Sequence, residues 1–235
     1  MEKIITNPLF WVLVTLVAFQ IGVYISKKTK LPIFNPILIA LTLIISGLLI
    51  FKIDYEVYNS GGQIINSFLG PATVVLAVPL YKQLDLLKKN FTAIIMGVVV
   101  GSTCSIISVI LLGKILGVDT QLIVSLIPKS VTTPIGVELS NSLGGITSIT
   151  IVSIVITGIA GAIIAPTVNR FLRIKSEIAI GIGIGTSSHA LGTTKAFEMG
   201  EAQGAMSSLS IGVAGLITVL IAPPIFTIAV KLLGL

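Results

Sequence analysis

The residues best suited to chemistry in this chain lie in two short polar stretches between long apolar runs. One stretch, Gly181 to Glu201, is GIGIGTSSHALGTTKAFEMGE and holds the only histidine, His189. The other, Pro128 to Gly145, is PKSVTTPIGVELSNSLGG. Both contain a hydroxyl-rich core with a Thr-Thr pair, a lysine, a glutamate and closing glycines, and a long apolar run ending in Ala-Pro follows each. This similarity indicates an internal repeat.

The side chains of these stretches suit the binding of a small anion such as a carboxylate. Lysine ammonium groups and hydroxyls donate hydrogen bonds, and the N-termini of interrupted helices present free N–H groups and partial positive charge. We expect the following residues to bind the substrate: Lys129, Ser130, Thr132, Thr133, Ser188, His189, Thr193 and Lys195.

Three side chains of these stretches could carry or balance charge. His189 can change protonation near neutral pH and would couple a proton to transport. Glu138 and Glu198 would balance the lysines or carry a cation. Glu198 lies three residues after Lys195, so the two could pair on one face of a helix.

Structural roles stay open for the same groups. Lys195 and Glu198 could form an ion pair with no further role, because charges inside membranes commonly pair. Lys129 could extend to the nearby membrane surface, and His189 could serve only as a hydrogen-bonding residue. The Thr-Thr pairs could bond back to carbonyls of their own helix.

The composition predicts an integral membrane protein. Of 235 residues 54% are hydrophobic and 10% charged, with a mean hydropathy of +1.08, whereas soluble domains carry roughly 25% charged residues. The net charge of +6 comes from short clusters between apolar runs, which indicate topology rather than nucleic-acid binding. One histidine and one cysteine, Cys104, argue against a transition-metal site. We expect no metal and no cofactor.

The apolar runs predict an all-α, polytopic helical membrane protein with about six transmembrane helices. Crossing a bilayer takes about 20 residues. The runs long enough to do so are Pro8–Ile25, Asn35–Phe51, Gly62–Leu80, Phe91–Leu112, Ile146–Val168 and Ala205–Val230.

Basic clusters follow the first, third and fifth runs, and the positive-inside rule places them in the cytoplasm. The loop near Asp119, at the opposite ends of these runs, would lie outside. Between Asp119 and the cytoplasmic Arg170, the chain must then cross the membrane an odd number of times. The run Ile146–Val168 crosses once. We therefore expect Gln121–Gly145 to form a re-entrant hairpin, and Glu177–Gly204 to form a second one from the cytoplasm.

These units predict an inverted repeat within a single membrane domain of residues 1–235. Residues 1–118 would be scaffold helices, residues 119–170 the first hairpin with its helix, and residues 177–235 the second. Interrupted segments of inverted repeats that meet near mid-membrane are a recurrent transporter plan. The alternative is that both polar stretches are broken spanning helices, which would make the units parallel and place Arg170 outside.

An enzymatic function is not expected. Gly181-x-Gly183-x-Gly185 lacks the spacing and the βαβ setting of a nucleotide-binding loop. A Ser-His-Asp triad would need an aspartate, yet the aspartates lie in predicted loops. A membrane hydrolase with a Ser-His dyad stays open as an alternative.

The chain resembles the CidB/LrgB family of membrane proteins over nearly its whole length. The motifs that carry the likeness are LIPKSVTTPIG (126–136), SLGGI (142–146) and GTSSHALGTTKAFEMGEAQGAMSSL (185–209). Upstream, FNPILIA (34–40) and PATVVLAVPLYKQ (71–83) fit as well.

This resemblance implies two functions of different classes. One is transport of small monocarboxylates such as pyruvate, glycolate or glycerate across the plasma membrane. The other is antiholin-like or holin-like control of murein hydrolase activity and cell lysis. The resemblance also implies a small CidA/LrgA-type membrane partner as a separate polypeptide, and a homo-oligomer stays open. We favour transport, because inverted polar interruptions at membrane depth suit alternating access.

Overall fold

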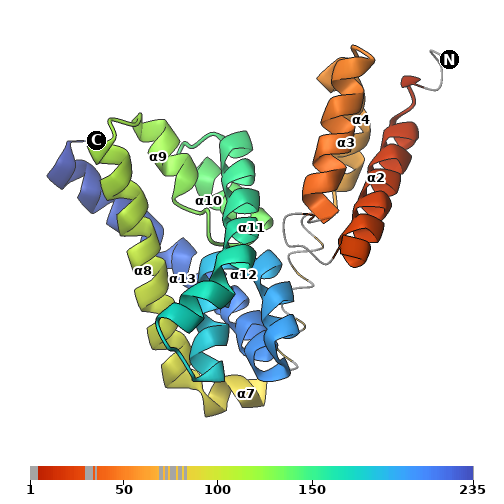
Figure 1. Cartoon of the computed structure of the whole chain (residues 1–235). Helices are drawn as coiled ribbons and strands as arrows, with labels where there is room; N and C mark the ends of the chain where they lie inside the picture. Colours follow the sequence, from red (N-terminus) through yellow and green to blue (C-terminus); the bar gives the residue numbers. More distant parts are fainter. Residues whose placement is uncertain are drawn as a thin grey trace. The chain divides into compact units, whose positions relative to one another are not determined.

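The computed structural model describes residues 5–29, 34, 36–68, 71, 74, 78, 81 and 84–234, and its regular structure in these ranges is helical (Figure 1). The predicted all-α class is therefore confirmed. The chain divides into two compact units, residues 1–72 and residues 73–235.

The described residues of the first unit include the helices α2 (Pro8–Thr29), α3 (Pro36–Ile50) and α4 (Tyr55–Asn66). Ala18 of α2 packs against Ala40 and Ile44 of α3. Helix α4 crosses the first half of α2, where the Thr15 hydroxyl lies 3.2 Å from the Tyr58 hydroxyl.

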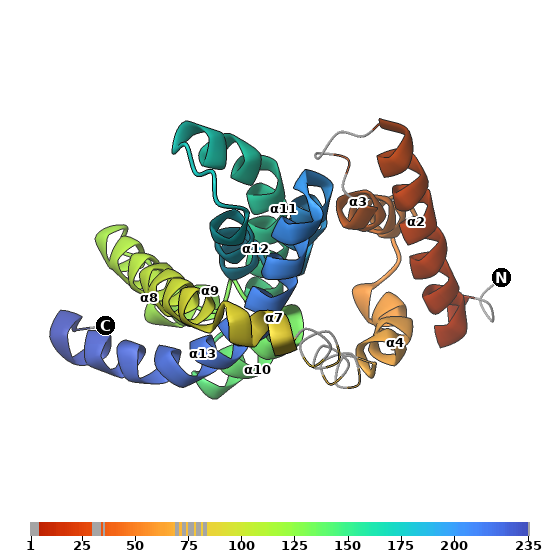
Figure 2. The same cartoon turned by 90° about the horizontal axis from the view of Figure 1, so that it is seen from below.

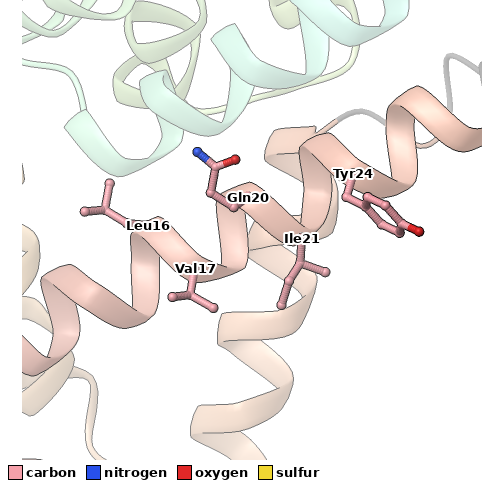
Figure 3. A pocket seen from close by; sticks show the side chains of 5 residues that line it. All are labelled: Leu16, Val17, Gln20, Ile21 and Tyr24. Atoms are coloured by element: carbon pink, nitrogen blue, oxygen red, sulfur yellow. The ribbon is translucent and has the colours of Figure 1, made fainter.

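One face of α2 carries a pocket of about 380 Å³ (Figure 3). Its lining side chains recur at helical spacing and are Leu16, Val17, Gln20, Ile21 and Tyr24. All but Gln20 are apolar or aromatic, as suits a helix with a lipid-facing or helix-facing surface.

In the second unit, the helices from residue 84 onward are α7 (Leu84–Lys89), α8 (Phe91–Ile115), α9 (Thr120–Leu126), α10 (Thr133–Ser142), α11 (Thr147–Phe171), α12 (Glu177–Met199) and α13 (Glu201–Leu233). Seen from below, α12 lies between α8 and α11 (Figure 2). The Lys114 ammonium donates to the Gly234 carbonyl at 3.3 Å, so α8 and α13 end side by side.

Within the described residues, four helices are long and apolar enough to cross a membrane: α2, α8, α11 and α13. They correspond to the first, fourth, fifth and sixth predicted runs. The second run forms α3, a shorter apolar helix of 15 residues. Of the third run, Gly62–Leu80, the part up to residue 66 belongs to α4, and most of the rest lies outside the described residues. The chain is thus a helical membrane protein.

Helices α9 and α10 form a hairpin whose end returns to its start. Pro128 prevents α9 from continuing, since proline lacks the backbone N–H, and Pro134 lies in the first turn of α10, a position that proline favours. After α10, the Ile146 N–H donates to the Ser125 hydroxyl of α9 at 2.7 Å. The first predicted stretch therefore reverses direction between the two helices.

Helix α12 is also a hairpin, because its backbone leaves helical geometry at His189, where φ is 42° and ψ is −141°. Beyond this residue the second half folds back on the first. Ala196 packs against Ile180 and Ile184. The start of α12 lies beside the start of α13, where the Gln203 side chain donates to Glu177 at 3.2 Å.

Candidate functional site

A cavity of about 790 Å³ in the second unit brings the two polar stretches together. Helices α8 and α11 form its walls and the first half of α12 its floor. Lys129 and Ser130, from the link between α9 and α10, line the same cavity as Ser188 at the tip of α12. Three of the predicted binding residues therefore meet at one site.

Lys129 is the charged residue among those that line this cavity. Its ammonium nitrogen lies 3.1 Å from the Ser130 hydroxyl and 3.1 Å from the Ser105 hydroxyl of α8. The two hydroxyl oxygens are 3.3 Å apart. A lysine, its neighbour and a serine of another helix thus form a closed polar triangle.

A count of protons in this triangle shows that donors are in excess. The ammonium has three N–H groups and donates two of them to the serines. The contact between Ser105 and Ser130 uses one of their two hydroxyl protons. One N–H and one O–H therefore remain. Among the described residues no carboxylate lies within ion-pair distance of Lys129, so the arrangement suits an anion that supplies two acceptor oxygens.

The tip of α12 is seated in a notch on α11. Gly158 and Gly161 lack side chains at this point, and an added Cβ on Gly161 would overlap the Ser188 hydroxyl. A Cβ on Gly158 would lie 2.6 Å from Cε1 of His189. The His189 Nε2 lies 2.8 Å from the Ile154 carbonyl oxygen. Because a carbonyl can only accept, Nε2 carries the proton and donates it.

His189 and Thr193 lie behind the cavity rather than in its lining. Both are buried, at 4% and 7% exposure. The Thr193 hydroxyl donates to the His189 carbonyl at 2.9 Å and contacts the Ser207 hydroxyl of α13 at 2.6 Å. The Ser207 contact connects α12 to α13, as the Ile154 contact of His189 connects it to α11.

The threonines of the first stretch lie at the start of α10, outside the cavity lining. Thr132 is the N-cap residue of α10. Its buried hydroxyl has no hydrogen-bond partner among the described residues. Thr133 is half-buried in the first turn.

The three remaining candidates lie at the surface of the unit. Lys195 pairs with Glu198 at 2.8 Å, with 28% and 61% of the two side chains exposed, and neither lines the cavity. The i, i+3 pair foreseen from the sequence is therefore formed. Glu138 is exposed on α10.

Sequence reasoning missed the polar residues that α8 and α11 contribute to the cavity. They are Ser105, Ser108, Thr157 and Asn169. Serines at positions 102, 105 and 108 interrupt an otherwise apolar run. Their spacing, with Gly97 and Gly101 on the same helix, is a signal that could have indicated a polar helix face.

Comparison with known proteins gives a family for most of the chain. Residues 15–228 match the LrgB-like family. The protein YxaC of Bacillus subtilis (strain 168) is 42% identical over 200 residues, which cover 85% of this chain and 87% of the relative. Antiholin-like protein LrgB of Bacillus cereus (strain B4264) is 39% identical over 218 residues, which cover 92% and 95%. A Bacillus anthracis protein with the same name matches equally well. No solved structure matches.

Proposed function

Because this chain belongs to the LrgB-like family of membrane proteins, we propose that it carries a small monocarboxylate across the membrane. The observation behind the proposal is the Lys129 ammonium, which is held by two hydroxyls and has no carboxylate partner among the described residues. A cation at membrane depth costs roughly 2.5–3.5 kcal/mol on insertion scales. A bound anion would offset that cost.

The substrate class follows from the two donors of the triangle that have no acceptor within it. One N–H and one O–H point to a ligand with two acceptor oxygens on one small group, which a carboxylate provides. The tip of α12 contributes Ser187 and Ser188 to the same cavity. Small acids of the pyruvate, glycolate or glycerate kind would fit such a site.

The proposed topology is an inverted repeat with six crossings in the plasma membrane. The α9–α10 hairpin begins where α8 and α13 end, and α12 begins at the other end of these helices. This opposition supports two hairpins that enter from opposite faces of the membrane. The clusters at Lys88, Lys89 and Arg170 would lie in the cytoplasm.

The role of His189 in this proposal is to brace the second hairpin. Its Nε2–H is engaged with Ile154, and the ring does not line the cavity. A coupled proton would therefore have to use Nδ1. Among the described residues no serine is hydrogen-bonded to the ring, which supports a non-enzymatic function.

A second candidate function is antiholin-like control of cell lysis. The names of the Bacillus cereus and Bacillus anthracis relatives support it more directly than they support transport. In either role we propose that the chain works with a small CidA/LrgA-type membrane protein, and assembly of several copies is compatible with both.

Uptake into proteoliposomes separates the two functions. We expect the wild-type protein, with or without the partner, to accumulate a labelled small carboxylate. Lys129→Met should abolish uptake, while Lys195→Met, which removes an exposed ion pair, should leave it near the wild-type level. A well-folded wild-type protein that moves no carboxylate even with its partner would contradict transport. If expression of the same protein still altered murein hydrolase activity in cells, the lysis function would be favoured.

A further inference from the structure

The cavity runs lengthwise from Lys129 toward one end of the second unit. Its lining on α8 extends from Ser108 back to Gly97, near the start of that helix. Its lining on α11 extends from Ile156 to Asn169, near the end of that helix. Because α8 and α11 run in opposite directions, the lining residues of the two helices lie along the same length of the cavity. The lining ends at Ile174, in the turn between α11 and α12.

On the α9 side of Lys129 the unit is filled by apolar packing. Ile106, Val109 and Ile110 of α8 pack with Ile123 and Ile127, which flank the first reversal. All five side chains are buried. The polar triangle therefore borders this packed region, and the α11–α12 turn lies at the other end of the cavity.

The turn beside the cavity carries three exposed cations. Arg170, Arg173 and Lys175 are all exposed and lie next in sequence to Asn169 or Ile174, which line the cavity. The turn is ordered by a bond from the Ile174 N–H to the Asn169 carbonyl at 2.9 Å.

Acidic groups at this end do not cancel the cations. Among the described residues of the second unit, six cations lie toward it: Lys88, Lys89, Arg170, Arg173, Lys175 and Lys195. Four acids lie toward it: Asp85, Glu177, Glu198 and Glu201. Glu177 accepts a hydrogen bond from Gln203 on the α13 side, and Glu198 is paired with Lys195. The opposite end has two of each: Lys114 and Lys231 with Asp119 and Glu138.

We propose that Arg170, Arg173 and Lys175 form an electrostatic entrance that draws small anions into the cavity from this end. A cleft flanked by charges of one sign focuses the field and raises the local concentration of counter-ions. An anion would be attracted first by the turn and then by Lys129 in the polar triangle. The inference rests on the proposed function for its purpose, while its test needs no transported substrate.

Cys104 provides the probe, because it is the single cysteine of the chain, is exposed, and lines the cavity. The full-length protein would be reconstituted in neutral phosphatidylcholine vesicles. The rates at which small anionic and cationic methanethiosulfonates modify Cys104 would be measured from each side and divided by their rates with a free thiol. We expect reaction from the side that exposes Arg173, with the anionic reagent favoured about ten-fold.

Removing the three cations of the turn tests whether they cause the preference for the anionic reagent. The triple variant Arg170→Gln, Arg173→Gln, Lys175→Gln should bring the ratio of the two rates close to one. Lys231→Gln, which removes an exposed cation at the opposite end, should leave the ratio unchanged. Elution and thermal midpoint in detergent would verify that each variant is folded.

Two results would overturn the entrance. They are a ratio unchanged in the triple variant, and modification of Cys104 only from the opposite side. A wild-type protein that shows the predicted rate ratio but takes up no carboxylate would remove transport and leave the entrance standing.

Discussion

The His189 imidazole donates from Nε2 to the carbonyl oxygen of Ile154 at 2.8 Å, and so joins the tip of α12 to α11. The same residue has φ 42° and ψ −141°, a conformation that residues with a Cβ rarely adopt. The ring lies over Gly158, whose missing side chain makes room for it. The side-chain contacts of His189 therefore hold a backbone reversal that its own conformational preference opposes.

Replacing His189 by alanine or glycine separates these two contributions. Both variants lose the bond to Ile154 and the packing on Gly158, so both should be less stable than the wild type. Glycine adopts a positive φ without the Cβ penalty, so His189→Gly should exceed His189→Ala in unfolding free energy by about 1 kcal/mol. Chemical denaturation in detergent micelles measures this order. An alanine variant as stable as the glycine variant would show that the backbone at 189 is not strained.

The notch on α11 should be sensitive to a single methyl group. In Gly161→Ala the new Cβ would overlap the Ser188 hydroxyl, so the tip of α12 must shift, at a cost of about 1–3 kcal/mol. Gly183→Ala is the matched control, because no atom lies within 4 Å of its added Cβ. Alanine favours helix there, so this control should gain up to about 1 kcal/mol. Equal thermal midpoints for the two variants would argue against close docking.

Both chain reversals can be predicted from the sequence because their residues conflict with a continuous apolar helix. Pro128 and Pro134 frame the first reversal, and a cluster of hydroxyls with the single histidine marks the second. The same polar content leads to Lys129, which lines the cavity. What local sequence cannot predict is that His189 itself adopts a positive φ, since only its contacts with α11 compensate for that conformation.

The two lysines illustrate where the repeat misleads. Each follows or precedes a Thr-Thr pair, and this similarity suggested equivalent positions. Lys129 lies within the first reversal, whereas Lys195 lies beyond the second, on the outer face of the returning half of α12. The position of each lysine relative to the reversal decides whether its side chain faces the cavity. The composition of the two stretches does not specify this position. Ser105 was missed for a related reason: its role depends on how α8 packs against a distant reversal.

Ser105 should affect ligand affinity through its contact with Lys129. Ser105→Ala removes one acceptor of the ammonium and one potential donor to the ligand, and should weaken carboxylate binding about ten-fold. Ser105→Thr keeps the hydroxyl and should restore most of the affinity. Ser108→Ala is the control, because the Ser108 hydroxyl lines the same cavity but donates to the Ser105 carbonyl at 2.8 Å. Ligand-induced shifts of the thermal midpoint measure all three; equal effects at 105 and 108 would remove the specific role of Ser105.

Two buried threonines should respond oppositely to the same isosteric change. The Thr150 hydroxyl lies 2.9 Å from the Ser125 carbonyl oxygen and 2.7 Å from the Ser140 hydroxyl, so Thr150→Val leaves buried groups unpaired. It should lower the unfolding free energy by about 1–3 kcal/mol. The Thr186 hydroxyl is buried and has no partner among the described residues. Thr186→Val removes an unsatisfied polar atom at constant shape and should leave stability equal or higher. Denaturation of both variants in the same detergent provides the comparison. A loss of unfolding free energy at Thr186 as large as that at Thr150 would contradict this prediction. It would mean that the Thr186 hydroxyl is hydrogen-bonded in the protein to a group that the described residues do not supply.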